Sequence, residues 1–180
     1  MFINIVTPCS RIQNLQAISE SINIPKCSYK WFVVFDSDTI PDIEKKINAS
    51  FYAVKNGDSI SGNSQRNAAI DLINDGYVLF LDDDTILHQD LWEEVNRCEE
   101  DIISWMQCLP DGRHRLNSGI YEVGYIDSGS FMVKRDIIGD LRWDIEKYDA
   151  DGHFAKRLLS NTKSQRRIDK YLSYYNFLRQ

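Results

Sequence analysis

Apolar runs and helix-spaced segments alternate along the first half of the chain. Consecutive apolar or aromatic residues predict strands at 3–7, 31–35, 51–54 and 77–81. Between these runs, polar segments with apolar residues at helical spacing predict helices after Arg11, at 42–47 and at 64–74. This order of short strands and helices predicts an α/β fold, with a mostly parallel sheet and helices on both faces.

The second half of the chain continues with less regular elements. The pattern predicts a helix at 91–98, a strand at 102–108, an exposed loop or hairpin at 109–118, strands at 120–123 and 130–133, and a helix at 152–159. We expect the two short strands to form a second, smaller sheet.

Helical spacing returns at the end of the chain. Ile168, Tyr171, Leu172, Tyr175 and Leu178 fall on one face of a C-terminal helix expected over 163–180. This face is expected to pack on the core. Because basic residues lie beside the tyrosines, an interface between two copies of the chain, a homo-oligomer, is the alternative role of this helix.

The run 77–81 ends at three carboxylates, Asp82, Asp83 and Asp84. A buried strand that ends in acids places them at the carboxyl end of a sheet, where open α/β folds bind ligands. Side chains two apart on an extended chain point the same way, so Asp82 and Asp84 should reach toward one point. A divalent cation relieves the repulsion between adjacent acids, and Mg²⁺ takes one or two carboxylates plus substrate phosphates. We expect a metal and phosphate site here; an acidic turn that caps the next helix is the alternative.

Composition narrows the classes of function. The 180 residues suit one domain, and the net charge of −6 comes without a long Lys and Arg cluster, which argues against nucleic-acid binding. No apolar run approaches about 18 residues and the N-terminus reads as a strand, so we expect no membrane span and no signal peptide. The four cysteines form no C-x-x-C pair, which favours reduced thiols in a cytoplasmic protein.

Further polar residues follow the other predicted strands. Parallel strands bring their carboxyl ends to one edge of a sheet, so these residues should lie near the acidic run. The start of the helix at 64–74 suits a diphosphate, because helix N-termini and guanidinium groups bind phosphate oxygens. The residues expected on this edge are Thr7, Pro8, Arg11, Asp36, Arg66 and Asn67.

These motifs, in this order, resemble GT-A type nucleotide-sugar glycosyltransferases. The likeness consists of Thr-Pro-x-x-Arg at 7–11, Gly-x-x-x-Arg-Asn at 62–67 and Asp-x-Asp at 82–84, and it covers about residues 1–160. Inverting family-2 enzymes are the closest general match. Parts of the chain, such as Gly152-His153, also resemble family-43 glucuronyltransferases.

The resemblance implies a single GT-A (Rossmann-like) domain over 1–180. Its nucleotide-binding half would cover 1–85 and its acceptor and catalytic half 86–162, followed by the C-terminal helix. It also implies transfer of a sugar from a nucleotide-sugar, with UDP as the expected nucleotide, to a hydroxyl on a glycan, a lipid-linked molecule or another acceptor, with inversion.

The resemblance assigns roles to the residues of the sheet edge. Thr7, Pro8, Arg11 and Asp36 would line the nucleoside pocket. Arg66, next to Asn67, would approach the diphosphate or the sugar. Asp82 or Asp83 would contact ribose or sugar, and Asp84 would hold Mn²⁺ or Mg²⁺ together with Asp82. The segment 127–130 would lie beneath the donor sugar.

The general base is expected just before a late helix, where family-2 enzymes carry an acidic pair. Asp151 is the first choice and Asp149 the second. His153 is a candidate late metal ligand, with a hydrogen-bonding role at the helix start as the alternative. The catalytic Glu of family 43 would fall on Ala155, which cannot act as a base. Either the family-43 likeness stops there, or this chain has moved or lost the base.

Two other classes of function fit the same residues. A hydrophobic strand followed by Asp-x-Asp also opens haloacid-dehalogenase-type phosphatases, although Ile86 stands where their pattern has Thr or Val. The chain could instead be a nucleotide-sugar-binding subunit without activity of its own. A trapped aspartyl-phosphate would indicate the phosphatase, and turnover of a UDP-sugar would indicate the transferase.

Overall fold

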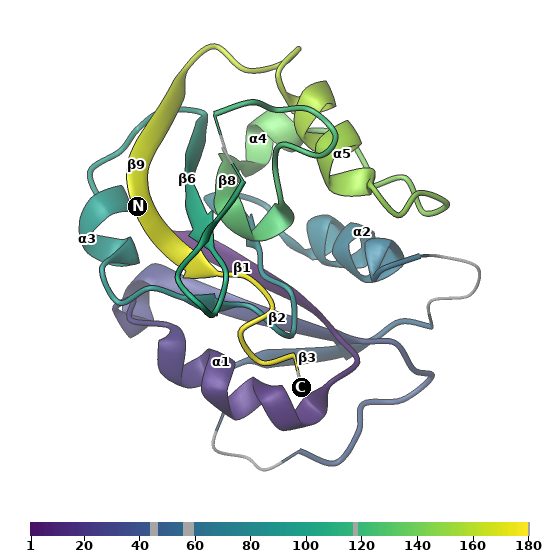
Figure 1. The fold of residues 1–180 in the computed structure, drawn as a ribbon. Coiled ribbons are helices and arrows are strands. Elements are labelled where there is room, and N and C mark those ends of the chain that lie inside the picture. The colour runs from purple at the N-terminus through teal and green to yellow at the C-terminus, as the bar shows by residue number, and fades with distance from the viewer. Residues whose placement is uncertain (44–46, 56–59, 117–118, 180) are drawn as a thin grey trace.

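The computed structural model describes residues 1–43, 47–55, 60–116 and 119–179 (Figure 1). Within these ranges the strands form one nine-stranded mixed sheet, in the order β3-β2-β1-β4-β8-β6-β9-β5, with β7 paired to β6. Part of the short helix expected at 42–47 lies outside the described residues. No helix in the described ranges is long and apolar enough to cross a membrane.

The first half of the sheet is parallel, as the sequence predicts. Its strands are β1 (Ile3–Cys9), β2 (Tyr29–Phe35), β3 (Ser50–Ala53) and β4 (Tyr77–Phe80). Strand β1 pairs with both β2 and β4, and β2 pairs with β3. The carboxyl ends of these four strands therefore lie along one edge of the sheet. The polar residues that follow the strands in the sequence lie at this edge.

Helices cover both faces of this sheet (Figure 1). On one face, α1 (Leu15–Ser21) packs Leu15 and Ile18 into the core cluster that includes Ile5. On the other, α2 (Asn63–Leu72) and α5 (Ala150–Leu158) share a second core cluster. The short helices are η1 (Ile12–Asn14), η2 (Lys26–Ser28), α3 (Leu91–Val95), η3 (Ser128–Ser130) and α4 (Arg135–Ile138).

The second, smaller sheet expected from the sequence is part of the main sheet. Strand β8 (Phe131–Lys134) pairs antiparallel with β4, and β6 (Ile102–Cys108) pairs antiparallel with β8. Strand β7 (His114–Leu116) forms a hairpin with β6. Without β8, the backbone N–H and C=O groups on one edge of the buried strand β4 would have no hydrogen-bond partners. Strand β8 pairs with this edge and supplies them. The segment 120–123, expected to be a strand, is irregular.

The prediction of a C-terminal helix over 163–180 is wrong, because residues Gln165–Tyr174 form a strand, β9. It pairs in parallel with β6, and β5 (Ile86–Leu87) pairs with it on its other side. Register shifts interrupt the β6–β9 pairing. Such bulges insert extra residues into one strand and break its two-residue alternation. Lys170 is therefore exposed although it lies between the buried Ile168 and Leu172, and the resulting spacing of four residues between buried positions resembles that of a helix. The interface proposed for that helix loses its basis.

We expect Ser173→Ala on β9 to destabilise the protein by about 1–3 kcal/mol, because it removes a buried hydroxyl with two partners. Ser173 Oγ donates to the Gly129 carbonyl at 2.7 Å and accepts from Trp105 Nε1 at 3.1 Å. Urea unfolding measures the change. Gln165→Ala, at an exposed position of the same strand, should stay within about 0.5 kcal/mol of the wild type. Equal stability of both variants would contradict the placement of β9.

Candidate active site

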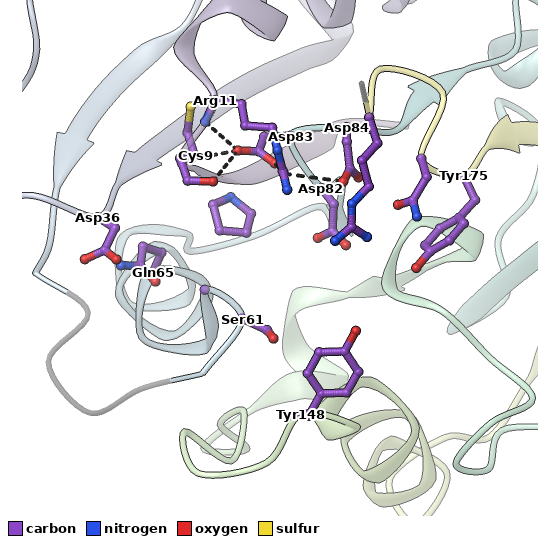
Figure 2. Close-up of a pocket in the computed structure, with 15 residues that line it drawn as sticks. Cys9, Arg11, Asp36, Ser61, Gln65, Asp82, Asp83, Asp84, Tyr148 and Tyr175 are labelled. Atoms are coloured by element: carbon purple, nitrogen blue, oxygen red, sulfur yellow. Dashed lines mark hydrogen bonds and ion pairs between the residues drawn. The ribbon is translucent and has the colours of Figure 1, made fainter. Parts of the chain in front are cut away.

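The three acids after β4 point in different directions and have different partners (Figure 2). Asp83 turns to the loop that follows β1. It accepts from the backbone N–H groups of Ser10 and Arg11 at 2.7 and 2.8 Å, from Ser10 Oγ at 3.0 Å and from Arg11 Nη1 at 2.5 Å. Asp83 therefore ties the ends of β1 and β4 together, and its oxygens are largely committed to the protein.

Asp84 is a buried carboxylate with little compensation. Its nearest cation is Arg11, whose Nη1 lies 3.3 Å from Asp84 Oδ2. Burial, and then the nearby charge of Asp82, raise the pKa of Asp84 to about 6. The folded protein thus keeps a carboxylate whose charged form is disfavoured, as expected for a group that a cation would stabilise.

Asp82 contacts helix α2, and not the loop after β1 that holds Asp83. Its carboxylate forms an ion pair with Arg66, which is itself buried. Arg66 also donates to the carbonyl of Ser61 at 2.6 Å and to Asn63 Oδ1 at 3.1 Å. Gly62, in the left-handed conformation, begins this helix, and an added Cβ would lie 2.5 Å from Pro8 Cβ. Only glycine allows α2 to start so close to β1.

A first cavity of about 340 Å³ opens above these acids. Asp36, at the end of β2, lies on its far side beside Gln65 of α2, and Arg11 and Asp83 border it near Asp82 and Asp84 (Figure 2). The lining residues are Pro8, Cys9, Ser10, Arg11, Asp36, Ser61, Gly62, Gln65, Asp82, Asp83, Asp84, Tyr148, Tyr175, Asn176 and Arg179.

The C-terminal residues of this lining were not expected from the sequence. After β9 the chain turns back to the acids, where the Leu178 N–H donates to the Asp84 carbonyl at 3.0 Å. Arg179 thereby comes near enough to lower the pKa of Asp84 against the effect of burial. Among the described residues, no ion pair of Arg179 is formed within 4 Å. Because the sequence analysis assigned this segment to a helix, it did not identify Tyr175 and Arg179 as candidate site residues.

A second cavity of about 300 Å³ adjoins the first and shares Ser61, Asp82, Tyr148 and Tyr175 with it. Asp151, at the start of α5, lines this cavity, and burial, followed by the charge of Asp127, raises its pKa to about 6. The other residues that line it are Asn63, Arg66, Arg115, Leu116, Val123, Gly124, Ile126, Asp127, Ser128, Trp143 and Asp149.

The wall of the second cavity is built around Asp127 and Arg115. Asp127 caps η3 and accepts from Gly129 N at 3.0 Å and Arg115 Nη1 at 3.0 Å. The Arg115 guanidinium also stacks on the ring of Tyr175. Burial raises the pKa of Asp127, and the charge of Asp82 adds to this effect. The segment 127–130 was expected next to the site, whereas Arg115 carried no signal in the sequence.

Several sequence-predicted residues take other roles. Thr7 is fully buried and accepts from Trp31 Nε1 at 2.9 Å, so it belongs to the core. Asn67 binds the backbone of Trp143 with both ends of its amide and lines neither cavity. Asp149 is half exposed on the rim of the second cavity, 3.6 Å from His153 Nε2. His153 lines neither cavity.

The residues fit a divalent cation only in part. In the described ranges no three His, Cys, Asp or Glu side chains gather closely enough to hold a metal by themselves. Asp82 and Asp84 nevertheless border one cavity, and the charge of Asp82 adds to the rise in the pKa of Asp84 that burial causes. Because Mg²⁺ is commonly held by one or two carboxylates plus substrate phosphates, this pair suits a cation that arrives with a diphosphate.

Comparisons with known proteins add a structural likeness. No family model matches the chain, and a search of curated proteins found no match. The structure resembles S. aureus TarS 1–349 with a TM-score of 0.76 at 17% identity, over 97% of this chain and 60% of that one. The same TarS fragment in complex with UDP-GlcNAc gives 0.75 at 18% identity, over 97% and 58%.

A further similar structure is the mannosyltransferase PcManGT from Pyrobaculum calidifontis, in complex with GDP-Man and Mn²⁺. The TM-score is 0.69 at 10% identity, over 97% of this chain and 56% of the mannosyltransferase. The chain therefore has the GT-A fold that its motifs suggest, and it spans about three fifths of the length of these neighbours. At these identities the likeness concerns the fold.

We expect Asp84→Asn to stabilise the ligand-free protein at pH 7. The folded pKa of Asp84 lies at about 6, above the ordinary 3.8, so the native state loses stability as the pH rises from about 4 through 6 and Asp84 ionises. Removing that charge should add about 1–2 kcal/mol, or about 2–8 °C in Tm.

Thermal unfolding from pH 4 to pH 8 measures this effect. The gain should vanish near pH 4, where wild-type Asp84 is protonated in the native state. Asp169→Asn, at an exposed position of β9, serves as the control. A variant that is less stable than the wild type at pH 7 would contradict the burial of an unfavourable charge.

Proposed function

We propose that the protein transfers a sugar from a nucleotide-sugar to the hydroxyl of an acceptor, with a divalent cation. The observation that carries this proposal is the position of Asp82 on the boundary of two adjoining cavities. One cavity contains Asp84, Arg11 and Arg179, and the other contains Asp151. A donor bound in the first would place its sugar at the entrance of the second, where a base stands.

The first cavity suits a nucleoside diphosphate. Arg11 and Arg179 provide guanidinium groups for phosphate oxygens, and Asp36 lies at the other end, where a base or ribose would offer hydrogen-bond donors. UDP is the nucleotide we favour from the sequence, and the TarS fragment binds UDP. GDP is the alternative, since PcManGT binds GDP-Man.

Asp82 and Asp84 would hold Mn²⁺ or Mg²⁺ together with the diphosphate. When bound, such a cation neutralises charge on the leaving diphosphate. The protein contributes the rest: Asp83 fixes the Arg11 loop against β4, and Arg66 holds the Asp82 carboxylate in place. The Leu178 hydrogen bond keeps the chain around Arg179 beside Asp84.

Asp151 is the proposed general base. Its raised pKa of about 6 leaves it mostly ionised at pH 7 and makes it a stronger base than an ordinary Asp. Asp151 takes the proton of the acceptor hydroxyl as that oxygen bonds to the anomeric carbon of the sugar. The bond from this carbon to the diphosphate oxygen breaks, and the diphosphate leaves with the electron pair. A single displacement of this kind inverts the anomeric centre.

Isothermal titration of UDP and GDP, each with and without Mn²⁺, tests the donor site. We expect the wild type to bind one nucleotide with a Mn²⁺-dependent gain, and Asp84→Asn to lose most of that gain, about tenfold or more in Kd. Asp169→Asn should bind like the wild type. If Asp84→Asn binds nucleotide and Mn²⁺ as tightly as the wild type does, the metal assignment is wrong.

We expect Asp151→Asn to retain donor binding and to lose transfer by a factor of about 10² to 10⁴. The wild-type rate should rise with pH through about 6 and then level off, because only ionised Asp151 accepts the proton. A panel of sugar nucleotides with hydroxyl acceptors, followed by release of the nucleoside diphosphate, measures the rates. Unchanged transfer by Asp151→Asn would move the base elsewhere, and binding without turnover in the wild type would favour a non-catalytic subunit.

A further inference from the structure

Two tyrosines stand where the two cavities meet. Of the described residues, Ser61, Asp82, Tyr148 and Tyr175 line both cavities and so mark the passage between them. Figure 2 shows the rings of Tyr148 and Tyr175 reaching toward this passage from separate segments, with their hydroxyl groups foremost. Aromatic side chains therefore form two walls of the space that a ligand occupies when it extends from one cavity into the other.

Tyr148 is exposed although the segment that carries it is fixed. Because 80% of Tyr148 is exposed, its ring packs against little of the protein. The residues before it are tied to helix α2, since Asn63 Nδ2 donates to the carbonyls of Asp144 and Lys147 at 2.9 and 3.0 Å. The packing of the fold thus gives no reason for an aromatic ring at this position, whereas a ligand in the passage would cover the ring and gain its contact area.

The ring of Tyr175 is held in place by Arg115. The guanidinium carbon of Arg115 lies 3.2 Å from the centre of the Tyr175 ring. Arg115 is itself held by hydrogen bonds from Nη1 to Gln107 Oε1 and Asp127 Oδ2, each at 3.0 Å. The backbone N–H of Tyr175 also donates to the carbonyl of Cys108 at 2.9 Å. Tyr175 is half-buried and still lines both cavities, so it offers a fixed aromatic surface to the passage.

The kind of group that suits two aromatic walls follows from their chemistry. The face of an aromatic ring carries partial negative charge, and the weakly positive C–H groups on one side of a sugar ring pack against it. A phosphate has no such groups. The nucleobase is expected near Asp36, on the far side of the first cavity, so the part of the donor that reaches the passage is the sugar.

We infer that the transferred sugar binds between the rings of Tyr148 and Tyr175. This inference rests on the proposed function, because the diphosphate in the first cavity brings the sugar to the passage. Tyr175 is the fixed wall, and Tyr148 is the exposed wall that the sugar covers. The two rings position the anomeric carbon between the diphosphate and Asp151 and take no part in the transfer of the proton.

Titrations with UDP and UDP-GlcNAc in Mn²⁺ test the inference, because the second ligand adds a sugar to the first. GDP and GDP-Man replace this pair if the protein prefers GDP. The quantity to compare is the Kd of the nucleoside diphosphate divided by the Kd of the sugar nucleotide. We expect Tyr148→Ala and Tyr175→Ala each to lower this ratio by about two- to tenfold. The Kd of the nucleoside diphosphate should stay within about twofold in Tyr148→Ala, since that variant removes a contact to the sugar alone.

Matched variants connect the effect to the aromatic rings. Tyr148→Phe and Tyr175→Phe keep the ring and should retain most of the wild-type ratio. Tyr125→Ala removes a tyrosine that is 50% exposed and lines neither cavity, so it should keep the ratio fully. Should Tyr175→Ala fail to fold, the exposed Tyr148 decides the test. An unchanged ratio in Tyr148→Ala, or a loss in Tyr148→Phe as large as in Tyr148→Ala, would overturn the inference.

The outcomes separate the two proposals. If neither UDP nor GDP nor any sugar nucleotide binds, the proposed function fails and the inference fails with it. If the nucleotides bind and the alanine variants keep the wild-type ratio, the donor site stands and only the inference is overturned. A rise in the KM of the acceptor at an unchanged ratio would place the acceptor between the rings, which also overturns the inference.

Discussion

The cost of three adjacent carboxylates at the end of a buried strand governs the arrangement of this site. Two of the carboxylates have close charged or hydrogen-bonding partners, whereas the third has only a longer ion pair, 3.3 Å from Arg11. Asp83 is surrounded by donors from the loop after β1, and Asp82 is paired with Arg66 of α2. Asp84 is buried beside Asp82 with a raised pKa. The β1 loop, the start of α2 and the C-terminal residues are all fixed by contacts to this triplet.

Contacts to these acids bring the segment after β9 and the start of α2 together at the end of β4. Arg11 contacts both Asp83 and Asp84, and the backbone of Asp84 accepts from Leu178. A cation at Asp84, as in the proposed function, would favour the ionised carboxylate that burial disfavours, and would thereby stabilise the folded protein. Under that proposal, cation binding and folding stability would be linked through the carboxylate of Asp84.

The sequence predicted the parts of the fold that depend on local pattern. Strands β1 to β4 and helix α2 appear where periodicity places them, and Pro8, Arg11, Asp36, Arg66 and Asp82 gather at the expected edge. Strand β9 could not be recognised, because its bulges against β6 give its buried residues the spacing of a helix. Tyr175 and Arg179 were missed with it.

The direction of each side chain was also beyond the sequence. Alternation suggested that Asp82 and Asp84 share one side, and the family resemblance implied that Thr7 lines the nucleoside pocket. Thr7 instead faces Trp31 in the core, and Asn67 faces the backbone of Trp143. Sequence position does not reveal these pairings, since they join residues that are 24 and 76 positions apart.

Paramagnetic broadening of backbone amide signals by Mn²⁺, recorded with the preferred nucleoside diphosphate, tests the central claim most directly. We predict that the signals of Asp82 to Thr85 broaden first, together with those of Ser10, Arg11 and Arg179, while those of Asp169 and Gln165 persist. Broadening centred on any other part of the chain, or none at all, would contradict a cation site at the end of β4.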